Sequence, residues 1–201
     1  MKYFLFFLFG ILQLKAECQG KYELFLNDSS ITVNADQYYT ISVGGQQIRI
    51  FLKSLDTLQF KDSIFSFKYF KDYKISKTEI QKGATQMLLT TADGSGFIVQ
   101  EYSILNPENL TELMLAEITK EKINYGYVSK REDYSRTLRT GQTLQIKRAT
   151  LTYKEEVHIF EVAAIGGKDK GILIITQIET ENYSKEAKKT INLLWDSLEY
   201  F

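Results

Sequence analysis

Residues 143–178, TLQIKRATLTYKEEVHIFEVAAIGGKDKGILIITQI, decide the fold of this chain. The run at 143–153 turns at Lys154-Glu155 into a second run at 157–165, and a loop at 166–171 leads into a third run at 172–178. Short connections between consecutive strands favour antiparallel pairing. The third run is the most apolar of the expected strands, so we expect an antiparallel sheet with 172–178 near its centre.

Further antiparallel hairpins are expected before this stretch. The clearest signal is Gly44-Gly45 between two alternating runs, because the favoured two-residue hairpin turns need positive φ. The polar residues 27–30, 61–63 and 92–96 are expected to form turns. The expected strands are 21–26, 39–43, 46–52, 57–60, 64–69, 85–91 and 97–103.

A first amphipathic helix is expected at 110–123. Two starts are compatible with the sequence: Pro107 in the first turn, where its missing N–H costs nothing, or a capping box of Asn109 and Glu112. Gly126 is expected to mark the exit of the helix. Its apolar side is expected to consist of Leu110, Leu113, Met114 and Ile118.

A second amphipathic helix is expected at 184–198, with Ser184 as its N-terminal cap. Apolar residues recur at helical spacing and predict that this helix lies on the sheet: Ala187, Ile191, Leu194, Trp195 and Leu198. The order of strands, helix, strands and helix predicts an α+β domain, with a mostly antiparallel β-sheet flanked by two main helices.

The chain resembles the Mog1/PsbP-like family between Leu58 and Phe201. The resemblance lies in residues 65–75, FSFKYFKDYKI, and in the tail at 195–201, WDSLEYF. Phe70 stands where the family usually has Pro, and Tyr73 where it usually has Trp. The resemblance implies an α/β/α sandwich around an antiparallel sheet and a protein-binding role without catalysis. Relatives include a photosystem II extrinsic subunit and a Ran-binding nuclear factor, but none of their binding residues is matched by a position in this sequence.

Residues 1–18 have the layout of a secretory signal peptide. Lys2 precedes an apolar run at 4–14, which is shorter than the roughly 20 apolar residues that cross a bilayer. Ala16 and Cys18 suit signal peptidase, so we expect cleavage between Cys18 and Gln19 and a secreted or periplasmic location. No stable transmembrane span is expected after processing.

An exported lipoprotein anchored through Cys18 is the alternative form of processing. Lipidation usually needs a small residue just before the cysteine and an apolar residue two places earlier. Glu17 and Lys15 occupy these positions, which makes a lipid anchor at Cys18 the less favoured expectation.

Composition narrows the expected partners. The chain has 25 basic and 25 acidic residues, and this balance argues against binding of nucleic acid or anionic lipid. Its only cysteine is Cys18, so no disulfide is expected in the mature chain of about 180 residues, whose fold must depend on its apolar core. The expected division is 1–18 signal peptide, 19–56 N-terminal β-hairpin extension and 57–201 Mog1/PsbP-like domain.

The two residue types most often used in catalysis are interpreted here as structural. His158 is the only histidine and lies in an expected strand, without a cysteine or second histidine that would complete a zinc site. Ser95 lies between Gly94 and Gly96, which differs from the G-x-S-x-G spacing of a nucleophile elbow, and a strand follows it.

The remaining polar and aromatic motifs are also interpreted as structural. Asp93 and Asp169 supply one carboxylate per loop, fewer than a calcium site needs, and Gly166-Gly167 lacks the helix that follows a phosphate-binding loop. A solvated helix face is expected at Lys185, Glu186, Lys188 and Lys189. Core packing, instead of a ligand groove, is expected for Phe65, Phe67, Tyr69, Phe70 and Tyr73. N-glycosylation sequons, relevant only in a eukaryotic secretory pathway, occur at Asn27, Asn109 and Asn182.

These observations predict an exported, non-enzymatic protein-interaction module whose partner is another envelope or secreted protein. No catalytic residue, cofactor or metal ligand is expected. The alternatives are a small apolar-ligand carrier of the periplasm, which needs small residues facing a pocket between sheet and helix, and the lipoprotein described above.

Overall fold

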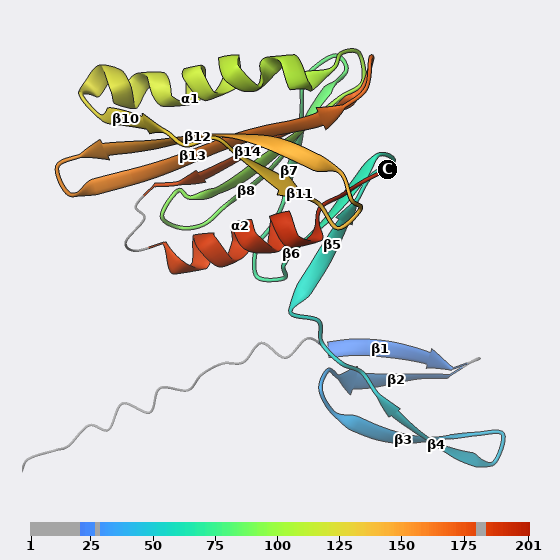
Figure 1. Ribbon diagram of the computed structural model, residues 1–201. Coiled ribbons are helices and arrows are strands. Elements are labelled where there is room, and N and C mark those ends of the chain that lie inside the picture. Colours follow the sequence, from blue (N-terminus) through green and yellow to red (C-terminus); the bar gives the residue numbers. More distant parts are fainter. Residues whose placement is uncertain (1–20, 27–28, 180–183) are drawn as a thin grey trace, which may run out of the picture. The chain divides into compact units, whose positions relative to one another are not determined.

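The computed structural model describes residues 21–26, 29–179 and 184–201, and the chain divides into two units, Met1–Leu55 and Asp56–Phe201. The predicted signal peptide, its cleavage site at Cys18 and the sequons at Asn27 and Asn182 lie outside the described residues. The two units are therefore considered one after the other (Figure 1).

The N-terminal unit consists of two separate two-stranded antiparallel sheets. β1 (Lys21–Leu26) pairs with β2 (Ser29–Asn34), and β3 (Tyr38–Val43) pairs with β4 (Gln46–Phe51). Gly44 and Gly45 have φ of 59° and 80°, which confirms the predicted hairpin turn. The turn predicted at 27–30 is wrong in its second half, because Ser29 and Ser30 already pair in β2.

A large antiparallel sheet forms the centre of the C-terminal unit. Along this sheet the strand order is β10-β12-β13-β14-β9-β8-β7, with β11 also paired to β12. β14 lies in the middle of this order, as its apolar sequence predicts. The strands are β7 (Ser76–Gln81), β8 (Ala84–Thr90), β9 (Gly96–Tyr102), β10 (Val128–Arg131), β11 (Tyr134–Thr137), β12 (Thr143–Tyr153), β13 (Glu156–Gly166) and β14 (Gly171–Ile178).

A second, three-stranded sheet has the order β15-β6-β5. It contains the predicted hairpin of β5 (Thr57–Lys61) and β6 (Phe65–Phe70), and the short C-terminal β15 (Glu199–Tyr200) joins its edge. Phe65 and Phe67 are fully buried, and Phe67 meets Phe97 edge to face. Their burial confirms the predicted core packing of Phe65 and Phe67, and Tyr69 and Tyr73 pack against the same cluster while partly buried.

The central strands of the large sheet are buried on both faces. Ile172 and Ile174 of β14 pack with one apolar cluster, whereas Leu173 and Ile175 pack with the other, as the two-residue period of a strand requires. α1 (Thr111–Tyr125) packs on β12 and β13, and α2 (Lys185–Ser197) packs on β6, β9 and β14. Figure 1 shows the two helices on opposite sides of the large sheet. The prediction of a mostly antiparallel sheet with two main helices is confirmed, and α2 shares its side with the small sheet.

The first of the two expected starts is confirmed, because Pro107 lies in the first turn of a 3-10 helix that runs directly into α1. Pro107 begins a 3-10 helix, Pro107–Leu110, and Asn106 caps it by accepting a hydrogen bond from the Glu108 N–H at 3.0 Å. The predicted capping box is wrong, because Leu110 precedes α1 without a side-chain cap and Glu112 forms ion pairs with Arg131 and Lys147. Gly126 ends the helix with φ of 114°, as predicted.

The apolar face of α1 also needs a correction. Leu113, predicted to face the sheet, is 60% exposed, whereas Leu115 is 2% exposed and lies in the core. The buried face of α1 is therefore rotated about the helix axis, relative to the face that the apolar spacing predicted. Leu110, Met114 and Ile118 do pack against the cluster that contains Leu115.

The predicted face of α2 is confirmed. All five of its expected contact residues are buried: Ala187, Ile191, Leu194, Trp195 and Leu198. On the opposite side Lys185, Glu186 and Lys189 are exposed, and Lys188 is half-buried. Among the described residues, neither helix has the length and apolar composition needed to cross a membrane.

Candidate functional site

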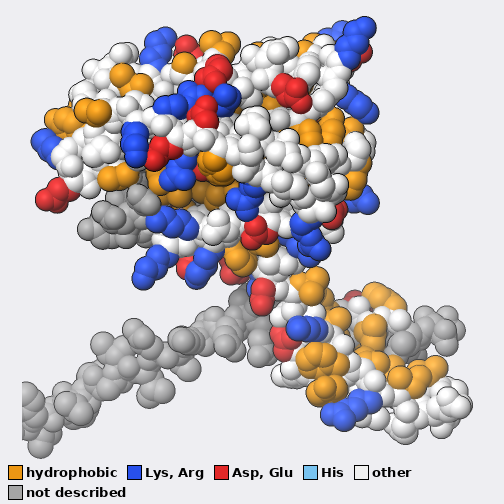
Figure 2. Space-filling model, in the orientation of Figure 1, with side chains coloured by type: hydrophobic (Ala, Val, Ile, Leu, Met, Phe, Trp, Pro, Cys, Tyr) orange, Lys and Arg blue, Asp and Glu red, His pale blue; other side chains and the backbone are white. Residues whose placement is uncertain are grey.

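An apolar groove of 390 Å³ lies within the N-terminal unit. Side chains from all four strands or their flanks form it, including Tyr22, Val33, Ile41, Ile50 and Phe51. Figure 2 shows hydrophobic side chains gathered on this small unit. The groove offers an apolar surface but no described cluster of ionisable groups, which suits binding and not acid–base chemistry.

The N-terminal unit buries little of its apolar surface. Val33 is its only buried residue within the described ranges. Seven large apolar side chains of the unit are between 37% and 70% exposed: Tyr22, Phe25, Tyr38, Ile48, Phe51, Leu52 and Leu55. Isolated two-stranded sheets are marginally stable at best in water, so this unit lacks the buried area that would stabilise it.

His158 lies on a strand, β13, as predicted. The ring is buried, with Nδ1 3.0 Å from Glu179 Oε2 and Nε2 3.6 Å from Glu156 Oε2. Neither ring nitrogen has a hydrogen-bond partner among the described residues, so these contacts are close but are not well-formed hydrogen bonds. Two carboxylates therefore lie beside the ring of His158.

Tyr127 and Lys122 extend this cluster toward α1. The Tyr127 hydroxyl donates to Glu156, and this hydrogen bond raises the pKa of Tyr127 to about 12. Lys122 Nζ lies 2.9 Å from Glu179 Oε2. Lys122, Tyr127 and Glu179 also line an open pocket of 430 Å³, whereas the imidazole is only 7% exposed behind them. The buried imidazole therefore lies between Glu156 of β13 and Glu179, the residue that follows β14.

Pairing in the sheet brings these groups together. Glu156 and His158 are two residues apart on one strand and so share a face. The register opposes Ile159 to Ile178, which places Glu179 beside His158. The first relation can be read from the sequence, but the second needs the register.

Ser95 and Asp93 anchor α2 to the β8–β9 hairpin. The Ser184 Oγ donates to Asp93 Oδ2 at 2.6 Å instead of capping its own helix, which corrects the predicted capping role. The hydroxyls of Ser184 and Thr91 lower the pKa of Asp93 to about 2. Ser95 is fully buried, and its Oγ accepts a hydrogen bond from the Glu179 N–H at 2.9 Å. This places Ser95 in a hairpin loop, as predicted.

The remaining predicted loop residues lie at the β13–β14 connection and in the 3-10 helix before α1. Gly167 and Asp169 lie in the connection between β13 and β14, and Gly166 is the last residue of β13. Asn109 lies exposed in the 3-10 helix that precedes α1. No group of three or more potential metal ligands was found among the described residues.

A polar pocket of 250 Å³ lies between the large sheet and α2. On its floor Glu161 is 8% exposed, and its carboxylate accepts hydrogen bonds from Tyr134 Oη at 2.9 Å and Thr176 Oγ1 at 3.1 Å. Burial and, after it, the charge of Glu161 raise the pKa of Tyr134 to about 12. Arg148 Nη1 is 3.8 Å from Glu161 Oε1, which is too long for a hydrogen bond.

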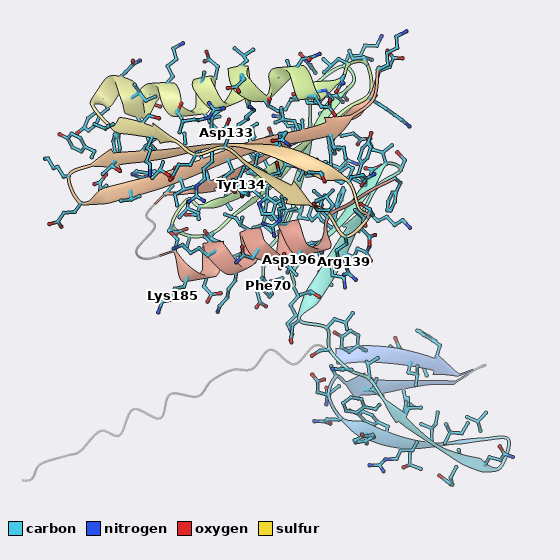
Figure 3. All side chains as sticks on the ribbon, in the orientation of Figure 1. Phe70, Asp133, Tyr134, Arg139, Lys185 and Asp196 are labelled. Atoms are coloured by element: carbon cyan, nitrogen blue, oxygen red, sulfur yellow. The ribbon has the colours of Figure 1, made fainter. Side chains whose placement is uncertain are left out.

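Arg136 and Trp195 form another part of this pocket. Arg136 Nη2 donates to Asp196 Oδ1 at 2.8 Å, and its guanidinium lies 5.6 Å from the centre of the Trp195 ring. Figure 3 shows Tyr134 on the sheet and Asp196 on α2. Sequence reasoning missed this pocket, because its polar residues come from four strands and one helix without any common spacing.

Comparison with protein families found no matching family, and comparison with curated protein sequences found no match. Among solved structures, the chain is similar to the solution structure of cyanobacterial PsbP (CyanoP) from Synechocystis sp. PCC 6803. The match covers 73% of this chain and 93% of that chain, with 9% sequence identity and a TM-score of 0.49. At this identity the similarity concerns the fold alone, so no residue role is transferred from CyanoP to this chain.

Proposed function

We propose that this chain is an exported, non-enzymatic protein-interaction module whose N-terminal unit binds an extended apolar segment of another envelope or secreted protein. The observation that supports this role most is the poor burial of the N-terminal unit. It exposes seven large apolar side chains, of which Tyr22, Phe51 and Leu52 line the groove of 390 Å³. Exposed apolar surface of this kind marks sites of protein association.

The chemistry of the partner follows from the strand edges. β1–β2 and β3–β4 are separate two-stranded sheets, so each has outer edges whose N–H and C=O groups have no strand partner within the described residues. An extended segment can pair with such an edge and place alternate side chains in the neighbouring groove. An apolar partner strand would therefore form hydrogen bonds with the edge backbone groups and would also bury the exposed apolar side chains.

Export and the absence of catalysis belong to the same proposal. The apolar run at 4–14 and the cleavage position after Cys18 support secretion or a periplasmic location. The residues that most resembled catalytic groups, Ser95 and His158, are buried in contacts that join structural elements. We also propose that the C-terminal unit is a variant of the α/β/α sandwich of Mog1/PsbP-like proteins. In this variant the small sheet and α2 together cover one face of the large sheet.

The carrier alternative receives less support for a ligand without any polar group. Part of the wall of the pocket between the sheet and α2 is charged, through Arg136, Arg148 and Glu161, and these groups would lose hydration against such a ligand. The lipoprotein alternative differs from the proposal only in the modification of Cys18.

Photo-crosslinking in the native host tests the interaction. A photoreactive phenylalanine analogue at Tyr22 or Phe51 should crosslink to one contiguous apolar segment of a second protein. The same analogue at Ile80, which is 46% exposed in the C-terminal unit, serves as the control and should not give that product. Crosslinks confined to a second copy of this chain, or equal products from Ile80, would contradict the proposed partner.

A further inference from the structure

The pocket between the large sheet and α2 has an unbalanced set of polar groups. Its lining includes three cationic side chains, Arg136, Arg148 and Lys188, and one carboxylate, Glu161. Both carboxylate oxygens of Glu161 already accept hydrogen bonds, one from Tyr134 and one from Thr176. Arg136 already donates to Asp196, so the polar groups left for an acceptor include the N–H donors of Arg148 and Trp195.

Two of these donors are buried without an acceptor. Trp195 is 2% exposed, and its Nε1 has no hydrogen-bond partner among the described residues. Nε of Arg148 is likewise buried without a partner in the described part of the chain. Leaving such donors unpaired costs free energy. Both atoms are buried, so a ligand carboxylate gains these hydrogen bonds when the side chains around the pocket shift to admit it.

We propose that this pocket binds a small organic acid through its carboxylate. A carboxylate suits a guanidinium because the two groups form charge-assisted hydrogen bonds, and it suits the indole N–H as an acceptor. Ile159, Ile178 and Ile191 also line the pocket and provide an apolar wall for the body of the acid. The volume of 250 Å³ lies below the roughly 300–1,000 Å³ of drug-sized sites, which limits the ligand to a small molecule.

This inference is independent of the proposed function of the N-terminal unit. Every residue that lines the pocket belongs to the unit Asp56–Phe201. Failure of one proposal therefore leaves the other intact.

Nuclear magnetic resonance of the ¹⁵N-labelled full chain tests the proposal directly. Trp195 is the only tryptophan, so the spectrum has a single indole N–H peak, and that peak reports on the pocket. Titration with hexanoate should shift this peak downfield and reach saturation at millimolar concentration, because the N–H gains an acceptor. Hexanol, which has a similar apolar body but no charge, and inorganic phosphate, which has no apolar body, should leave the peak in place.

Variants of Arg148 distinguish specific hydrogen bonding to the ligand carboxylate from attraction by positive charge alone. Arg148→Gln should weaken hexanoate binding about tenfold or more, and Arg148→Lys should restore only part of it because lysine keeps the charge but lacks the planar fork. Arg139→Gln is the matched control, since Arg139 is exposed and lies outside the pocket lining (Figure 3). An unchanged dispersion of the amide peaks in each variant verifies the fold.

Three results would overturn the proposal. These are the absence of a saturable shift with hexanoate, an equal shift with hexanol, and binding of hexanoate that survives in Arg148→Gln. A shift with phosphate alone would overturn the assignment of an organic acid. It would show that the pocket binds an oxyanion and that the apolar wall contributes nothing to binding.

Discussion

At the scale of single residues, Trp195 helps to dock α2 on the apolar core. Its side chain is 2% exposed and belongs to the same apolar cluster as Phe67, Ile174 and Leu198. Removing a buried Trp side chain typically costs about 3–5 kcal/mol, so Trp195→Ala should lower the free energy of unfolding by that amount. Denaturant titration measures it, with exposed Lys185→Ala as the control that should change by about 0.5 kcal/mol or less. An unchanged midpoint for Trp195→Ala would show that α2 is not docked.

The titration of Asp93 is expected to make the free energy of unfolding depend on pH in the acid range. Hydrogen bonds from Ser184 and Thr91 lower its pKa to about 2 from an ordinary value near 3.8. A lowered carboxyl pKa stabilises the fold above about pH 4, and this contribution disappears as the pH falls toward 2. We expect Ser184→Ala to show a smaller loss of stability between pH 5 and about pH 2.5 than the unmodified chain, because the largest cause of the shift is gone. Urea midpoints at the two pH values measure the difference, and parallel losses in both proteins would contradict this role of Asp93.

At the scale of elements, the junction between β13 and β14 is closely packed. A Cβ atom on Gly171 would lie 2.6 Å from the Ile165 carbonyl oxygen and 2.7 Å from Cδ of Pro107, which presses on the junction from the 3-10 helix. Gly171→Ala should therefore destabilise the chain by about 1–3 kcal/mol through overpacking. Gly167→Ala is the matched control, since nothing lies within 4 Å of the added atom and it should be nearly neutral. Thermal unfolding of the two variants checks this. Equal midpoints for Gly171→Ala and Gly167→Ala would show that the backbone at the junction shifts to accommodate the added Cβ at little cost.

Some elements could be predicted from sequence, and the reason is apolar periodicity. β12, β13 and β14 alternate or are wholly apolar, and Gly44-Gly45 requires a turn of positive φ, so these were found with nearly correct ends. β7 and β10 were missed because every residue in them is exposed and no apolar pattern marks them. The face of α1 was misplaced because Leu113 and Leu115 are both leucines, and only packing decides which one is buried.

The sites were harder to predict than the elements. The residues of the pocket beneath α2 were each visible in the sequence, but no spacing relates Tyr134 or Arg148 to Trp195. Their meeting depends on the antiparallel order β11-β12-β13-β14 and on α2 returning to that sheet. The environment of His158 likewise depended on the strand register that places Glu179 beside it.

At the scale of the whole molecule, the proposed export makes a prediction about mass. Intact-mass measurement of the protein from its native host should give a chain that begins near Gln19. A mass increase equal to a diacylglycerol on Cys18 would instead support the lipoprotein alternative. An unprocessed chain that begins at Met1 and stays in the cytosol would contradict export.

The proposed interaction role requires that the N-terminal unit is incomplete until a partner binds. Amide hydrogen exchange of the isolated full chain measures this most directly, because protection reports the free energy of local opening. The amides of β1 to β4 should exchange at rates close to those of an unfolded peptide, while those of β13 and β14 remain protected by the buried core. Protection in β3 and β4 equal to that in β13 and β14 would show that the N-terminal unit is stable by itself and would contradict the proposed need for a partner.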